Sequence, residues 1–250
     1  MAEASDLQDF VDGADVDSAV FALRPDYRVL LLAVDGLTTG ASDASSEALL
    51  RRAEEAAAAL LTGVGAEELP HIAAWREACR AFGAKPQRTR NSLEALTRRA
   101  GTGLPRVNRL TDIYNAVSVL HQVPIGGEDL TRYSGSPRLL RAAGTEPFDT
   151  TVDGETAIEH PGPGEVVWCD DAGVTCRRWN WRQARRTQLT PHTTTALFIL
   201  DALAPMTGEA LTAAGDELLA CLHPLGREVR SATRLISSNR RTPATPQENA

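Results

Sequence analysis

The sequence lacks or is poor in several features that common activities require. Only Lys85 is a lysine, aromatic residues make up 5% of the chain, and the four cysteines form no Cys-x-x-Cys pair. A phosphate-binding loop requires Gly-x-x-x-x-Gly-Lys, and Lys85 follows an alanine, so the sequence excludes a nucleoside triphosphatase of that kind. The cysteine spacing matches neither a zinc pattern nor a disulfide framework.

Other catalytic signatures are absent too. The segments Gly-Val-Gly at 63–65 and Gly-Thr-Gly at 101–103 lack the third glycine of a dinucleotide fingerprint. No His-Glu-x-x-His occurs, and Tyr-Ser-Gly-Ser at 133–136 is not a nucleophile elbow. We therefore expect no cofactor, no metal, and no conventional hydride or catalytic-triad mechanism.

The chain also lacks long hydrophobic runs. The strongest run, residues 29–34, is far shorter than the ~20 residues that a membrane-spanning helix needs. The first 17 residues carry six acids and no apolar segment, which argues against a secretory signal. We expect a cytoplasmic protein with no membrane partner, made of an acidic tail (1–20), one domain (21–235) and a disordered tail (236–250).

Charge is unevenly distributed along the chain, whose net charge is −7. Residues 76–109 carry nine lysine or arginine side chains against two acids, residues 146–171 carry eight acids and no lysine or arginine, and five arginines fall within 177–186. An acidic protein with two basic stretches can contact a polyanion locally while staying soluble.

The hydrophobic pattern predicts helices first and a sheet later. Residues 27–35 have the length and composition of a buried strand, and residues 110–120 place apolar side chains at the i, i+3, i+4, i+7 spacing of a buried helix face. Further elements are predicted at 42–61, 67–82, 93–100, 194–203 and 208–222. The order predicts an α+β fold, in which N-terminal helices precede a mainly antiparallel sheet and a C-terminal helix.

Residues 176–186 combine two tryptophans with five arginines. In a strand, Arg177, Trp179 and Trp181 would share one face, and Arg178, Asn180 and Arg182 would share the other. If the chain turns helical near Asn180, Arg178, Arg182 and Arg185 align instead. Guanidinium groups beside aromatic rings suit phosphate binding and base stacking. The alternative is structural: the tryptophans belong to the core and the arginines pair with the preceding acidic stretch.

Two further polar groups stand out. Asn108, Asp112 and Asn115 have helical spacing on one face, and Pro-Ile-Gly-Gly-Glu-Asp at 124–129 adds flexible backbone and Glu128 just beyond that helix. The threonines of residues 187–195 include Thr194; they suit either the surface of a sheet or the positioning of a ligand hydroxyl. A solvated helix face is the alternative for the first group.

Six blocks, taken in order, resemble the freestanding B3/B4-domain proteins, which are similar to the editing module of the phenylalanyl-tRNA synthetase β subunit. The blocks are Lys-Pro-Gln with Arg-Asn-Ser-Leu-Glu-Ala (85–95), Leu-Pro-Arg-Val-Asn (104–108), Thr-Asp-Ile-Tyr-Asn-Ala-Val-Ser (111–118), Pro-Ile-Gly-Gly-Glu-Asp (124–129), Pro-Gly-Glu-Val-Val (163–167) and Cys-Arg-Arg-Trp-Asn-Trp-Arg (176–182). In the synthetase the module hydrolyses mischarged tyrosyl-tRNA. Its Gly-Gln-Pro-Leu-His-Ala-Phe-Asp motif corresponds to residues 121–129 here, where glycine stands near the histidine position.

The resemblance implies a B3/B4-like fold whose partner is the aminoacylated 3′ end of tRNA. It places Asp112 and Asn115 on a pocket-lining helix and residues 178–181 on the pocket wall. One hypothesis is ester hydrolysis in trans, with Asn115, Asn180 and Thr194 as catalytic positioning groups. The substrate would then be bound by Asp112, Glu128, Arg177, Arg178, Trp179 and Arg182. The alternatives are a binding module without turnover, and a small-molecule enzyme or sensor that reuses the pocket.

Overall fold

The computed structural model describes residues 4–238, which fold around two main sheets. The four-stranded sheet has the order β11-β2-β10-β3, and all its neighbouring strands are antiparallel. These strands are β2 (Arg28–Asp35), β3 (Ile125–Asp129), β10 (Thr195–Ala202) and β11 (Arg230–Ser237).

The second sheet has five strands in the order β1-β4-β7-β8-β9. Its first pair is parallel and the others are antiparallel. The strands are β1 (Asp15–Val16), β4 (Arg138–Arg141), β7 (Val166–Asp170), β8 (Gly173–Arg177) and β9 (Arg182–Gln183). A separate hairpin joins β5 (Phe148–Val152) to β6 (Glu155–Glu159).

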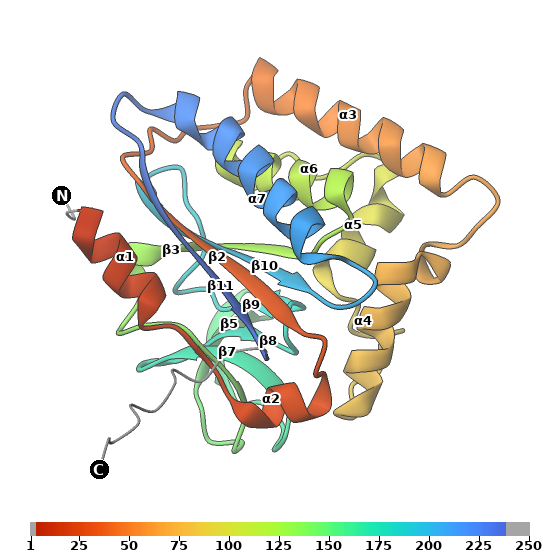
Figure 1. Ribbon diagram of the computed structural model, residues 1–250, viewed down its shortest axis with the longest axis vertical. Coiled ribbons are helices and arrows are strands. Elements are labelled where there is room, and N and C mark those ends of the chain that lie inside the picture. Colours follow the sequence, from red (N-terminus) through yellow and green to blue (C-terminus); the bar gives the residue numbers. More distant parts are fainter. Residues whose placement is uncertain (1–3, 239–250) are drawn as a thin grey trace, which may run out of the picture.

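Helices cover one face of the four-stranded sheet, and the second sheet lies on the other side (Figure 1). The covering helices are α3 (Ala44–Leu60), α6 (Arg109–His121) and α7 (Gly208–Leu222), with α5 (Ser92–Ala100) beside α6. The remaining elements are α1 (Ala4–Asp12), α2 (Ser18–Leu23), α4 (Pro70–Ala81) and the 3₁₀ turns η1 (Ala66–Glu68), η2 (Leu130–Arg132) and η3 (His223–Leu225).

Strand β2 explains why the core has two layers. Because strand side chains alternate, Leu30 and Leu32 pack beneath α3, α6 and α7, whereas Leu31 and Ala33 face α1 and the second sheet. A strand buried on both faces reads as the continuous apolar run seen at this position.

The α+β prediction is confirmed, and three details differ from expectation. The acidic N-terminus is not a tail, because α1 buries Leu7 and Val11 against β2 and β11. The last described element is a strand rather than a helix; β11 was missed because it is an edge strand that buries only Ala232 and Ile236. The expected C-terminal tail began at residue 236, which lies within β11, and residues 239–250 lie outside the described residues.

Helix boundaries follow local capping chemistry. Asn91 caps α5 by accepting a hydrogen bond from the Glu94 amide, and Asn108 caps α6 by accepting one from the Thr111 amide. Residues 124–129, expected to be flexible, form β3 and pair along β10. Among the described residues, no helix is long and apolar enough to cross a membrane.

Candidate functional site

A cavity of about 250 Å³ lies where the two sheets meet α5 and α6. Its walls come from α5, α6, β3, β7, β8, β9, β10 and the turn between β8 and β9. The residues that line it are Ser92, Ala95, Leu96, Tyr114, Asn115, Ile125, Gly126, Glu128, Trp168, Cys176, Trp179, Asn180, Trp181, Gln183, Ile199 and Asp201. Ligand sites are typically concave and largely apolar, with a few convergent polar groups, and this cavity fits that description.

The turn between β8 and β9 carries unusual backbone geometry. Arg178 and Trp179 have φ angles of 49° and 68°, in the left-handed region that non-glycine residues rarely adopt. Two backbone hydrogen bonds hold the turn: Trp179 N donates to Val166 O at 2.7 Å, and Ser92 N donates to Asn180 O at 2.9 Å. The turn is thereby fixed to both β7 and the start of α5.

The Trp179 indole is clamped by other aromatic rings. It is fully buried, with ring centroids 5.0 Å from Tyr27 and 5.3 Å from Trp75, both in edge-on arrangements. Edge-to-face pairs of this kind stabilise a core beyond the area that they bury. This side of the cavity is therefore rigid.

Glu128, on β3, is a buried carboxyl group in the cavity wall and is 1% exposed. Burial raises its pKa to about 7, although a hydrogen bond from Tyr133 Oη to Oε2 at 2.5 Å works in the opposite direction. The neighbouring Gly127 is required because a Cβ there would lie 2.8 Å from the Tyr114 ring. That contact lets β3 lie close against α6.

Asp201, on β10, is the second buried carboxyl group of the cavity. Burial raises its pKa to about 7, and the negative charge of Glu128 adds to the rise. Tyr27 Oη donates to Oδ1 at 2.6 Å, and Asn180 Nδ2 lies 3.5 Å from Oδ2. Two carboxyl groups in one cavity, both with a raised pKa, are typical of a functional site.

The remaining polar groups of the cavity are neutral. Asn180 is 6% exposed and its Oδ1 is buried without a hydrogen-bond partner among the described residues; the same holds for Ser92 Oγ. Asn115 forms no side-chain hydrogen bond within residues 4–238. Burial raises the pKa of the Cys176 thiol well above its ordinary value, so this cysteine is not a thiolate at neutral pH.

A groove lined by arginines adjoins the cavity. Arg88, Arg90, Arg98 and Arg99 line it, together with Ala95 and Trp181, which also line the cavity. Arg98 and Arg90 pair with Glu94, but within the described residues Arg88 and Arg99 pair with no carboxylate. We call this surface the arginine groove.

The structure brings some of the predicted site residues together. Asn115, Glu128, Trp179 and Asn180 all line the cavity. Arg178 lies just outside, with its guanidinium 4.4 Å from the centre of the Trp181 ring. Because Trp181 borders both cavity and groove, this stack lies between them.

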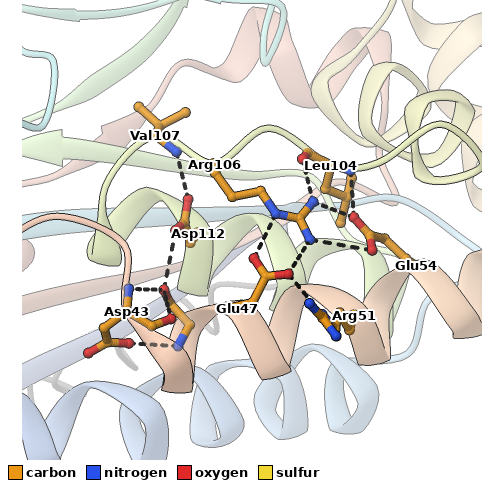
Figure 2. Close-up of polar contacts among 9 residues, drawn as sticks. Asp43, Glu47, Arg51, Glu54, Leu104, Arg106, Val107 and Asp112 are labelled. Atoms are coloured by element: carbon orange, nitrogen blue, oxygen red, sulfur yellow. Dashed lines mark hydrogen bonds and ion pairs between the residues drawn. The ribbon is translucent and has the colours of Figure 1, made fainter.

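Asp112 lies elsewhere. It is fully buried, and its carboxylate accepts hydrogen bonds from Val107 N at 2.9 Å and from Ser46 Oγ of α3 at 3.2 Å (Figure 2). The expected polar stripe does not form, because Asn108 caps the helix and Asp112 faces α3 while Asn115 faces the cavity. Figure 2 also shows Arg106 held between Glu47 and Glu54.

Three other predicted residues also lie outside the cavity. Arg177 is neutralised, with Nε and Nη2 2.8 and 2.9 Å from the Glu165 carboxylate and Nη1 2.9 Å from Glu159. Arg182 donates to the Thr151 carbonyl at 3.0 Å. Thr194 is exposed just before β10. The expected strand alternation through residues 177–182 fails because the chain turns after Arg177.

Sequence reasoning missed Asp201 and Trp168. The signal for Asp201 was present, since it is the one charged residue of the otherwise apolar segment 195–202. Charged residues are seldom buried without a structural or functional role. Trp168 gave no such signal, because a tryptophan in an apolar strand reads as core. Within residues 4–238 no group of three or more His, Cys, Asp or Glu side chains is arranged to hold a metal ion.

Fold and site together define an α+β domain with an acid-containing cavity between two sheets. Residues 74–213 match the family described as the B3/4 domain, and the chain belongs to this family. Among solved structures it is similar to an N-terminal fragment of the phenylalanyl-tRNA synthetase beta-subunit from Pyrococcus horikoshii, at 14% identity and a TM-score of 0.44. That similarity covers 87% of this chain and half of the fragment. No curated protein matches the chain.

Proposed function

We propose that this protein binds the aminoacylated 3′ end of a tRNA and hydrolyses the ester that joins the amino acid to it. The observation that carries the proposal is the junction of two unlike sites at Trp181 and Ala95. The cavity suits a small organic group, and the arginine groove suits phosphates. An aminoacyl-tRNA end presents both groups, joined at a single ester.

The cavity holds the groups that ester hydrolysis requires. The amides of Asn115 and Asn180 are available to hold the ester carbonyl and a water. The water oxygen attacks the carbonyl carbon and its proton passes to Glu128, whose pKa of about 7 suits a general base near neutral pH. The bond to the ribose oxygen then breaks, and that oxygen takes the proton.

A deacylation assay with a panel of mischarged tRNAs tests this proposal. We expect the purified protein to release the amino acid faster than buffer from at least one member, and Asn180→Ala to abolish the release. Thr156→Ala, an exposed position on β6, is the matched control and keeps full activity. If the amino acid is released from every mischarged tRNA of the panel only at the rate seen in buffer, the proposed hydrolase activity is refuted.

Binding without turnover is the second candidate, and one observation favours it. Both carboxyl groups already accept a hydrogen bond from a tyrosine hydroxyl, Tyr133 for Glu128 and Tyr27 for Asp201. These bonds hold the carboxyl groups in fixed positions and reduce their basicity. Salt-dependent tRNA binding with no release of amino acid identifies the chain as a binding module.

A further inference from the structure

The deep end of the cavity contains a buried hydrogen-bond acceptor without a partner, next to a buried carboxyl group. Asn180 Oδ1 is buried with no partner among the described residues. Asp201 Oδ2 has the 3.5 Å approach of Asn180 Nδ2, and the Trp168 indole also acts on the Asp201 carboxyl group as a hydrogen-bond donor. Both side chains line the cavity and are at most 6% exposed. A buried acceptor left without a donor costs free energy, so a ligand that brings N–H donors is favoured at this position.

The charge of this region is uncompensated. Neither Asp201 nor Glu128 forms an ion pair with any described residue. The guanidinium that acts on Glu128 from a distance, Arg186, is already held by Asp170 through contacts of 2.5 and 2.9 Å. A ligand cation would therefore be the first positive charge to reach Asp201.

Aromatic rings complete the surroundings. Trp168 and Trp179 line the cavity and are almost fully buried, and Tyr114 and Trp181 line it nearer the surface. The face of an indole ring attracts a cation within about 6 Å, and pockets with aromatic walls and an acid are a common way of binding ammonium groups. Desolvation by these rings also strengthens a charge pair with Asp201.

From these contacts we infer that the cavity recognises a primary ammonium group, which donates to Asp201 Oδ2 and Asn180 Oδ1 against the Trp168 and Trp179 rings. The three N–H donors of an ammonium match the two acceptors with one to spare. The inference rests on the proposed function in so far as it makes the substrate an aminoacyl group with a free amine. Asp201 then binds the substrate cation while Glu128 remains available to take a proton.

The direction of entry follows from burial. Asp201 is 2% exposed, whereas Ser92, Ala95 and Trp181 are partly exposed and Trp181 borders the arginine groove. The ligand therefore enters with its ammonium group first and leaves its anionic end at the groove. At about 250 Å³ the cavity is smaller than the ~300–1,000 Å³ typical of sites for drug-sized ligands, and it suits a single amino acid residue.

Paired small ligands test the inference on the intact protein. The amides of alanine, valine, leucine, phenylalanine and tyrosine are each compared with the analogue that carries a hydroxyl in place of the ammonium, using ligand-observed NMR at pH 7, where most of the α-amino groups are protonated. We expect at least one amide to bind at least tenfold more tightly than its hydroxy analogue. Equal binding of every pair, or no binding of any amide up to 50 mM (about the weakest affinity that such NMR detects), overturns the inference.

Asp201→Asn supplies a second test. Tyr27 can still donate to the new amide oxygen, so the fold is retained, and we expect amine binding to weaken at least tenfold while Thr156→Ala binds as the wild type does. Unchanged amine binding in a folded Asp201→Asn variant overturns the inference.

N-acetylated aminoacyl-tRNA separates this inference from the proposed function. If the protein hydrolyses the acetylated and free-amine substrates equally fast, the proposed hydrolase activity is supported and ammonium recognition is refuted. If no tRNA is deacylated but the amides bind through Asp201, ammonium recognition is supported and the proposed hydrolase activity is refuted. Faster hydrolysis of the free-amine substrate supports both.

Discussion

Replacement of Glu128 by glutamine tests the electrostatics of the cavity directly. Burial raises the Glu128 pKa from 4.5 to about 7, so the folded protein holds this proton more tightly than the unfolded chain does. The stability that comes from the neutral carboxyl is complete below pH 4 and is lost as the pH rises through 7. The rise of the pKa from 4.5 to about 7 makes the folded protein with an ionised Glu128 less stable by about 3 kcal/mol at pH 8. Glutamine is neutral at every pH, so the variant does not lose this stability.

The assay is urea unfolding followed by circular dichroism at pH 4 and pH 8. We expect Glu128→Gln to match the wild type at pH 4 and to exceed its free energy of unfolding by about 3 kcal/mol at pH 8. Glu155→Gln, an exposed position on β6, controls for a general effect of removing one negative charge. A difference between Glu128→Gln and wild type that is the same at both pH values refutes the reasoning.

Three other variants probe residues outside the cavity. Arg177→Leu leaves Glu165 buried without its main partner and lowers the free energy of unfolding by about 3 kcal/mol, measured by urea denaturation; a loss below about 1 kcal/mol contradicts a structural role. Asp112→Ala strands the Val107 amide and costs about 2 kcal/mol by the same assay, with amine binding unchanged; weakened binding contradicts its placement. Arg88→Gln with Arg99→Gln lowers the slope of log tRNA affinity against log salt by about 2 in filter binding, and an unchanged slope shows that phosphates lie elsewhere.

The elements that the sequence predicts are the helices with one buried face and the strands with both faces buried. Strand β2 and helix α7 follow from unbroken or periodic apolar residues, and the caps Asn91 and Asn108 follow from their side-chain chemistry. Strand β11 is different, because its partner β2 lies about 200 residues away and only two of its side chains reach the core.

The sequence predicts only part of the site, because some of its residues are brought together by tertiary contacts rather than by a local motif. Asn115 and Glu128 follow from motif resemblance, but the hairpin turn at Arg178 and Trp179 has positive φ angles that the residue types do not suggest. Strand alternation places Arg177 and Trp179 on one shared face. Because of the turn, Arg177 instead pairs with Glu165 and Trp179 packs in the core. Asp201 becomes a partner of Asn180 only through the contact between two sheets, which no local pattern records.

The concentration of indoles at the cavity has a spectroscopic consequence. Three of the four tryptophans, Trp168, Trp179 and Trp181, line it, and the fourth, Trp75, lies 5.3 Å from Trp179. Excitation therefore passes readily among neighbouring rings, and nearly all of the intrinsic emission arises in or beside the cavity. A ligand that displaces water or brings a charge there shifts and quenches the fluorescence of the whole protein, so occupancy can be followed without any label.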